Sequence, residues 1–325
     1  MNLKKILIAT TLFAALTCSV FAKAKSAKDG KLKVVATIFP QYDWTREILG
    51  DKADSVQLTL LVGNGVDLHS YQPSIQDIAK ISTADIFIYV GGESDGWVKD
   101  ALKNATNKNM KVINLLEVLG DKVKAEEIKE GMQAEEEEDE DSDEEEVEYD
   151  EHVWLSLRNA KILSAEITKV LSEKNAANAA AYKANYAAYS AKLDALDKEY
   201  SAAVASASKK TILFGDRFPF RYLTDDYGLD YYAAFVGCSA ETEASFETVV
   251  FLSKKVDELG LNSVLKIESG DGKIAKTIVQ NTKNKTASVL TLDSIQSTTL
   301  KQAAAGTTYL KIMENNLKVL KEALK

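Results

Sequence analysis

The chain has 325 residues, 46% of them hydrophobic and 27% charged, which is typical of a globular protein with room for two domains of ordinary size. Residues 135–151 include 14 acidic residues and no basic one, and without those 14 charges the net charge of −9 becomes +5, so the acidity is one local feature. The composition excludes a strongly basic nucleic-acid-binding protein, and two cysteines are too few for a disulfide scaffold or a four-cysteine zinc module.

The N-terminus has the pattern of a secretory signal peptide, which we expect to span residues 1–22. Two lysines precede an almost wholly apolar stretch, Ile6–Leu16, that is too short to cross a bilayer. Small residues up to Ala22 form an acceptable cleavage site, and polar residues follow it. We therefore expect an exported protein, in the periplasm or at the outer face of the cytoplasmic membrane. Cys18 offers the alternative of a lipid anchor.

Residues 31–158 alternate short apolar runs with segments of helical periodicity. Strands that alternate with helices, each strand largely apolar, indicate a parallel sheet that is covered on both faces. We therefore expect an N-terminal α/β lobe here. Its expected strands are Lys33–Ile38, Val56–Leu61, Ile86–Val90 and Lys111–Leu115.

Residues 208–325 repeat this alternation, which predicts a second α/β lobe of similar size. Its expected strands are Thr211–Phe214, Asp230–Phe235, Ser263–Ile267 and Ala287–Leu292. Residues 159–207, between the two lobes, contain no glycine or proline, are rich in alanine, and place tyrosines and leucines at helical spacing. The segment 177–207 would form one stiff helix of about 45 Å. The sequence thus predicts two parallel-sheet lobes joined by a long rigid helix.

The acidic run dominates a low-complexity loop that we place at about residues 122–151. Carboxylates at this density repel one another, which predicts a solvated, disordered segment. Carboxylate oxygens are also ligands for hard cations, so the loop is expected to attract cations weakly and at several points.

The chain has only two histidines, and both follow an aspartate in the pattern Asp-x-His. His69 lies in a loop after an expected strand, and His152 lies at the end of the acidic run. Ligand sites in open α/β sheets lie at the carboxyl ends of strands, and imidazole is the commonest metal ligand. An acidic neighbour can orient such a ring. The two histidines are therefore candidate metal ligands.

At these motifs the chain resembles a known family. The segments Asp67–Pro73, Asp-x-His-Ser-Tyr-x-Pro, and Asp150–Ser156, Asp-x-His-Val-Trp-Leu-Ser, are similar to the two ligand motifs of the metal-specific solute-binding proteins of zinc/manganese ABC transporters. The Gly-rich turn Gly91–Trp97 and the end of the last strand, Leu292–Ser294, resemble the same family. The resemblance covers essentially all of the mature chain. It implies two α/β lobes joined by a rigid helix, a metal in the cleft between them, and a monomer.

The chain departs from the family pattern at one ligand. Arg217 stands where the family carries a third ligand, and arginine stays protonated and cannot ligate a metal. Asp293 matches a fourth family ligand, although it could equally be a turn or cap residue. Asp216 and Cys238 are candidates for the vacant position, against the alternatives of an ion pair and a small buried residue, and water is another candidate. Glu268 could pair with Arg217.

We expect a binding protein that captures a divalent metal outside the cytoplasmic membrane and delivers it to an ABC permease, and we expect no enzyme activity. Two imidazoles suit Zn²⁺, and Mn²⁺ is the alternative. A zinc hydrolase would use a similar ligand set, but no histidine remains to act as general base. An exported adhesion protein or metal buffer with a degenerate site is a further alternative.

Overall fold

The computed structural model describes residues 30–133, 148–239 and 243–325 of the chain. The expected signal peptide, Cys18 and most of the acidic run lie outside these residues. Residues Lys31–Lys325 group into one compact unit, so the division into two lobes and a connector with the boundaries given above stays a prediction. Within the described residues, no helix combines the length and the apolar character needed to cross a membrane.

The first sheet is wholly parallel, with strand order β2-β1-β3-β4. Its strands are β1 (Leu32–Ala36), β2 (Val56–Leu60), β3 (Ile86–Tyr89) and β4 (Lys111–Asn114). The accompanying helices are α1 (Phe39–Leu49), α2 (Ile75–Ser82), α3 (Val98–Lys103) and α4 (Leu115–Leu119). The strands lie where the apolar runs predict them, because the strands of a parallel sheet covered by helices are largely apolar.

The second sheet repeats this topology with the order β6-β5-β7-β8. Its strands are β5 (Thr211–Phe218), β6 (Asp230–Val236), β7 (Ser263–Lys266) and β8 (Ser288–Thr291). The helices that follow them are α7 (Arg221–Tyr227), α8 (Phe246–Leu259), α9 (Lys273–Asn281), α10 (Leu300–Ala304) and α11 (Tyr309–Ala323). Strand β5 continues four residues beyond its expected end, past a register shift between Phe214 and Arg217. This irregularity re-aims the side chains of Asp216 and Arg217.

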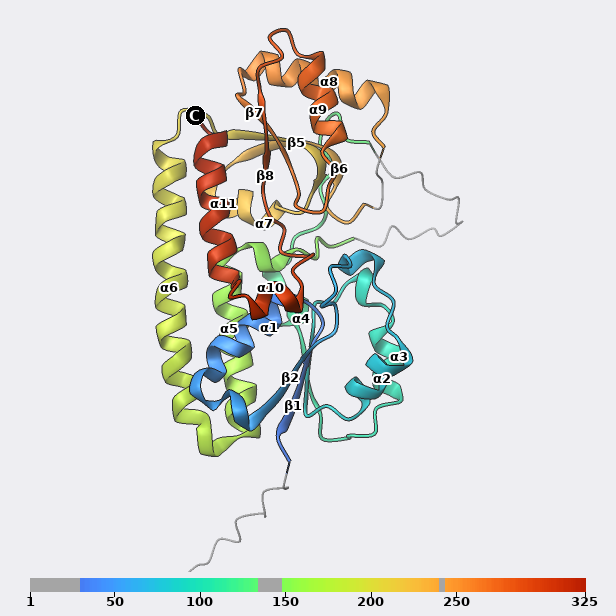
Figure 1. The fold of residues 1–325 in the computed structure, drawn as a ribbon, viewed down its shortest axis with the longest axis vertical. Coiled ribbons are helices and arrows are strands. Elements are labelled where there is room, and N and C mark those ends of the chain that lie inside the picture. The colour runs from blue at the N-terminus through green and yellow to red at the C-terminus, as the bar shows by residue number, and fades with distance from the viewer. Residues whose placement is uncertain (1–29, 134–147, 240–242) are drawn as a thin grey trace, which may run out of the picture. The chain divides into compact units, whose positions relative to one another are not determined.

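The helical segment between the sheets consists of two helices, α5 (Leu157–Lys174) and α6 (Ala179–Ser206). Helix α6 is 28 residues long without a break, or about 42 Å, and Figure 1 shows it running beside α5 and α11. Tyrosines at helical spacing along α6 form one buried face of the helix, which contains Tyr182, Tyr189 and Tyr200. The hydroxyl of Tyr200 donates a hydrogen bond to the Met313 carbonyl at 2.6 Å, which fixes α6 against α11.

A buried aromatic pair ties the beginning of the described chain to its end. Trp44 on α1 and Tyr309 on α11 are both completely buried, with ring centroids 5.3 Å apart in a T-shaped arrangement. The Tyr309 backbone N–H donates to Asp43 at 2.7 Å, and its hydroxyl donates to the Trp154 carbonyl at 2.6 Å. Trp154 lies two residues after His152 in the second histidine motif, so this core also anchors that motif.

Candidate metal centre

His69 lies in a short 3-10 helix, Leu68–Ser70, in the loop after β2. The carboxylate of Asp67 accepts a hydrogen bond from the His69 backbone N–H at 3.1 Å and so caps this turn. Leu68 is buried and anchors the turn in the core. Nδ1 of the His69 ring lies 2.7 Å from Oγ of Ser94, in the Gly-rich turn after β3. Nε2 therefore stays available on the opposite side of the ring.

His152 is completely buried, and the apolar residues that follow it fix it in place. Oδ1 of Asp150 accepts a hydrogen bond from the His152 backbone N–H at 2.8 Å and lies 3.0 Å from Nδ1 of the ring. Trp154 donates from its indole nitrogen to the Ser294 carbonyl at 2.9 Å, and its ring lies 5.2 Å from the His152 ring. The expectation that the aspartate of Asp-x-His orients the ring is thus met at His152. At His69, Ser94 contacts the ring instead.

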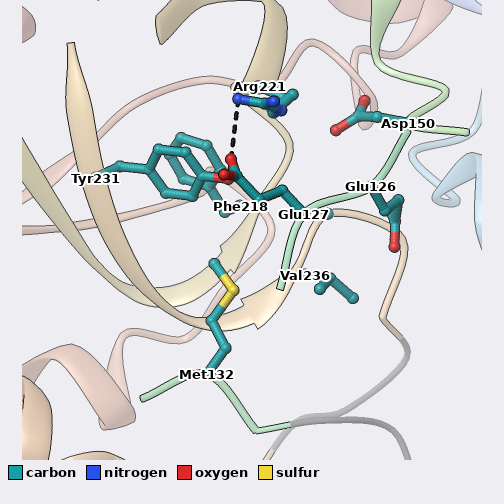
Figure 2. Close-up of a pocket in the computed structure, with 9 residues that line it drawn as sticks. Glu126, Glu127, Met132, Asp150, Phe218, Arg221, Tyr231 and Val236 are labelled. Carbon is teal, nitrogen blue, oxygen red and sulfur yellow. Dashed lines mark hydrogen bonds and ion pairs between the residues drawn. The ribbon is translucent and has the colours of Figure 1, made fainter. Parts of the chain in front are cut away.

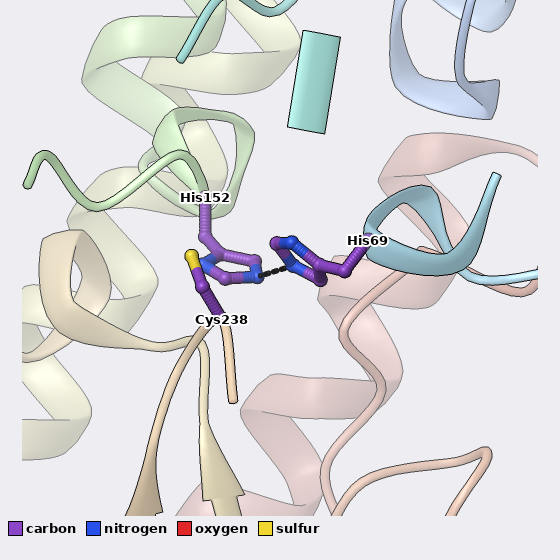
Figure 3. A group of neighbouring side chains, drawn as sticks. All are labelled: His69, His152 and Cys238. Atoms are coloured by element: carbon purple, nitrogen blue, oxygen red, sulfur yellow. Dashed lines mark hydrogen bonds between the residues drawn. The ribbon is translucent and has the colours of Figure 1, made fainter. Parts of the chain in front are cut away.

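The two imidazoles face each other, as Figure 3 shows. Their Nε2 atoms are 3.0 Å apart, and their ring centroids are 5.0 Å apart. Each ring has its Nδ1 against an oxygen of a neighbouring residue, a contact that fixes the orientation of metal-binding histidines. Two nitrogens that converge in this way are suited to bind one cation between them.

The two histidines differ in how readily they accept a proton. Burial, the neighbouring His152 and the Arg217 guanidinium lower the pKa of His69. Burial opposes protonation of His152 as well, but the carboxylates of Asp150 and Glu151 outweigh it and raise the pKa of that ring. When the two rings together bind one extra proton, that proton is on His152. A metal ion that binds to His152 has to displace this proton.

Cys238 completes a group of three potential ligands. One ligand atom each from His69, His152 and Cys238 lies within 4.8 Å of the others, and no other such group occurs in the described ranges. Burial and the nearby Glu126 raise the pKa of the Cys238 thiol, so it is protonated without a metal. The Cys238 backbone N–H donates to Glu126 at 3.2 Å.

His69 and Cys238 also line the same pocket, which has a volume of about 230 Å³. Its other lining residues are Glu93, Ser94, Glu126, Glu148, Tyr149 and Glu151. Glu151 is only 2% exposed, and its Oε2 has no hydrogen-bond partner among the described residues. Burial raises the pKa of Glu151 to about 7. The pocket therefore combines side chains that can bind a metal cation with buried carboxylates whose negative charge such a cation would stabilise.

Arg217 does not pair with Glu268, contrary to the expectation from the sequence. Its guanidinium forms an ion pair with Asp67 and donates to the Ser239 carbonyl at 3.2 Å. Glu268 instead accepts hydrogen bonds from Ser294, the closest at 2.7 Å from the Ser294 backbone N–H. Arg217 thus links the loop of His69 to the residue that follows Cys238.

Asp216 and Asp293 lie outside the three-residue group. The two carboxylate oxygens of Asp216 accept hydrogen bonds from the backbone N–H groups of Arg217 at 3.0 Å and Ile267 at 3.2 Å. Asp293 accepts one from the Ile295 backbone N–H at 2.8 Å, which supports the left-handed conformation of Ile295. Burial and the nearby Glu268 raise the pKa of Asp293 to about 7. The roles of both aspartates as ligands stay predictions.

The sequence interpretation missed several residues that contact this centre, among them Ser94, Glu126 and Gln296, whose side-chain amide lies 3.1 Å from Nε2 of His152. Ser94 lies in the Gly-rich turn that carries part of the family resemblance, and this resemblance was the only feature of the sequence that could have pointed to it. Glu126 precedes the acidic run and has no motif around it, and only the structure brings it to Cys238.

A second, smaller cavity is lined by Glu126 and Asp150 among other residues (Figure 2). Arg221 forms an ion pair with Glu127 at 3.0 Å, and the Tyr231 hydroxyl donates to the same carboxylate at 3.0 Å. Tyr231 stacks on Phe218 with ring centroids 3.7 Å apart. The cavity holds about 10 Å³, which is roughly the space of one water molecule. The contacts of Glu127 with Arg221 and Tyr231 therefore hold its segment against the second sheet.

The Gly-rich turn carries a buried carboxyl that makes stability depend on pH. Asp95 is 3% exposed, and burial raises its pKa to about 6 against the lowering effect of the N–H groups of Gly91 and Val90. The folded protein therefore binds this proton more tightly than the unfolded chain, whose pKa is about 3.9. The contribution of Asp95 to the free energy of unfolding therefore falls as the pH rises from about 4 to 6.

We expect Asp95→Asn to remove this dependence. Relative to the parent, the variant should gain up to about 3 kcal/mol of unfolding free energy between pH 4 and pH 7, since one pKa unit corresponds to about 1.4 kcal/mol. Urea unfolding of both metal-free proteins at the two pH values measures the difference. An equal difference between variant and parent at both pH values would contradict this role of Asp95.

Comparisons with known proteins agree with the fold. The zinc-binding protein AdcA of Streptococcus pyogenes serotype M18 is 31% identical over 326 residues, covering 98% of this chain. The chain spans only 61% of the length of that relative. The high-affinity zinc uptake system protein ZnuA of Bacillus subtilis is 32% identical over 299 residues, covering 92% of this chain and 89% of the relative. Both relatives are named for zinc.

A solved structure extends this likeness to three dimensions. The Zn(II)-bound ZnuA-like domain of Streptococcus pneumoniae AdcA is 29% identical, with a TM-score of 0.69, over 91% of this chain and 99% of that domain. The prediction of two parallel-sheet α/β lobes with a long helix is thus confirmed. Residues 34–323 match the family model described as zinc-uptake complex component A, periplasmic. The chain therefore belongs to the ZnuA family of metal-specific solute-binding proteins.

Proposed function

We propose that this chain is an extracytoplasmic binding protein that captures Zn²⁺ and delivers it to an ABC permease. The observation that carries the proposal is the pair of Nε2 atoms of His69 and His152, 3.0 Å apart, each ring oriented through its Nδ1. Membership of a family described as a periplasmic zinc-uptake component supports it. The chain acts as a monomer, either free after cleavage behind Ala22 or anchored through Cys18.

The chemistry of the centre favours capture and release of zinc. Neutral imidazole is a good ligand for Zn²⁺, while Mn²⁺ prefers sites richer in oxygen. His69 lines an open pocket, so a metal can enter and leave on that side. Carboxylates at the same pocket raise the local concentration of cations without closing the site.

The alternatives have less support. A zinc hydrolase needs a general base beside the metal, and both histidines of the chain are in the proposed ligand pair. The family is one of binding components, which agrees with the expectation that the chain is not an enzyme. An adhesion protein with a degenerate site would need no aligned imidazoles. A metal buffer would depend on the acidic run and not on His69 and His152.

Calorimetric titration tests the proposal directly. Residues 23–325 are stripped with a chelator and titrated with Zn²⁺ and with Mn²⁺. We expect one tight zinc site per chain and weaker binding of manganese. Only weak, multiple binding of zinc would refute the capture function. For delivery, cells that lack the protein should grow poorly under zinc chelation, and the parent gene should restore growth.

A further inference from the structure

The ligand position that Arg217 cannot fill lies beside a thiol. Cys238 follows β6, and one ligand atom from each of Cys238, His69 and His152 lies within 4.8 Å of the others (Figure 3). In a tetrahedral zinc site, with bonds of about 2.3 Å to sulfur and 2.0–2.1 Å to nitrogen, sulfur and nitrogen are roughly 3.6 Å apart. Binding a metal therefore needs the sulfur to approach the nitrogens by no more than roughly 1 Å, while the two Nε2 atoms, 3.0 Å apart, move slightly apart.

We propose that the thiolate of Cys238 is the third ligand, and that this makes the site selective for thiophilic cations of the zinc type over Mn²⁺. The inference rests on the proposed function and adds to it the chemical class of the metal. A set of two imidazoles and one thiolate suits Zn²⁺, whereas Mn²⁺ prefers carboxylate and carbonyl oxygens. A fourth position stays available for water or for exchange during release.

The contacts of Arg217 support this placement of Cys238. One end of its guanidinium pairs with Asp67, which caps the turn that carries His69. The other end donates to the carbonyl of Ser239, the residue after Cys238. The side chain that replaces the family ligand therefore connects the two loops that carry His69 and Cys238.

Two of the nearby carboxylates, those of Asp216 and Glu151, are less suited to be the third ligand. Both oxygens of Asp216 accept backbone hydrogen bonds. Oε2 of Glu151 lies 3.7 Å from Nδ1 of His69, on the side of the ring away from His152. Glu151 is buried with that oxygen lacking a hydrogen-bond partner among the described residues, and it lines the same pocket as Cys238. This carboxylate would balance the charge of a cation from outside the ligand set.

Cobalt spectroscopy on Cys238→Ser tests the proposal. The full chain carries Cys18→Ser throughout, so that Cys238 is its only thiol. With Co²⁺ as probe, the parent should show a thiolate-to-metal charge-transfer band in the near ultraviolet, and Cys238→Ser should lose it. The zinc affinity should fall at least about 100-fold, beyond the 10- to 100-fold typical of residues that only orient a ligand. The affinity for Mn²⁺ should change less than about threefold, because manganese gains little from a thiolate.

Serine keeps the size of the side chain, and an unchanged thermal midpoint of the metal-free variant shows that it folds. A parent that binds one zinc tightly through its histidines, but whose Co²⁺ complex lacks the charge-transfer band, overturns the thiolate ligand and leaves the proposed function standing. A parent without any tight zinc site overturns both.

Discussion

Replacing both His69 and His152 by alanine is expected to abolish the tight zinc site, with a loss of affinity of at least about 1,000-fold. Mutation of a residue that only orients a metal ligand typically lowers the metal affinity 10- to 100-fold. The double variant removes two proposed ligands themselves, so its loss should be larger. The chain has only these two histidines, so no imidazole remains in the double variant to replace them. Competition against a zinc chelator of known affinity measures the loss.

The matched control is deletion of residues 135–147, which removes most of the acidic run but neither histidine and no residue that lines the pocket. The deleted chain should keep the tight site and lose only weak, salt-sensitive binding, since exposed charges are screened by salt. The reverse pattern, with tight binding that survives the double variant and disappears with the deletion, would identify the acidic run as the binder.

Trp44→Ala should lower the free energy of unfolding by about 3–5 kcal/mol, the range for removing a large buried aromatic side chain. Trp44 is completely buried on α1 and packs edge-on against Tyr309 of α11, with ring centroids 5.3 Å apart. The variant loses this contact and leaves a cavity at the junction of the first and last described helices. Chemical denaturation with circular dichroism as the signal measures the change.

Trp44→Phe is the control for this prediction. The indole nitrogen of Trp44 is buried without a hydrogen-bond partner among the described residues, so phenylalanine removes an unpaired donor as well as some volume. We expect this variant to lose less than about half as much stability as Trp44→Ala. Equal losses for the two variants would mean that the aromatic contact does not stabilise this junction.

Much of the fold was predictable because the central strands of its two sheets are largely apolar and buried. An apolar run such as Ile86–Val90 indicates such a strand directly, and the run without glycine or proline after Asn159 indicates helices. The end of β5 was not predictable in this way. Asp216 and Arg217 are polar, and only pairing with β6 across a register shift keeps the strand going to Phe218.

The centre was predictable only in part. His69 and His152 were found because both histidines share one short motif, and local sequence determines the contact of Asp150 with His152. The approach of Cys238 and the pairing of Arg217 with Asp67 depend on how distant segments pack, which no local pattern encodes. Asp67 and Arg217 are 150 positions apart in the sequence.

The indole of Trp154 gives the centre an optical signal of its own. Its ring centroid lies 5.2 Å from that of His152, while Trp97 contacts Tyr71 and Trp44 contacts Tyr309. An imidazole at that distance quenches indole emission to a degree that depends on whether it carries a proton or a metal ion. One of the three tryptophans is therefore a built-in fluorophore for the state of His152. Loading and unloading can be followed by stopped-flow emission on the unlabelled protein.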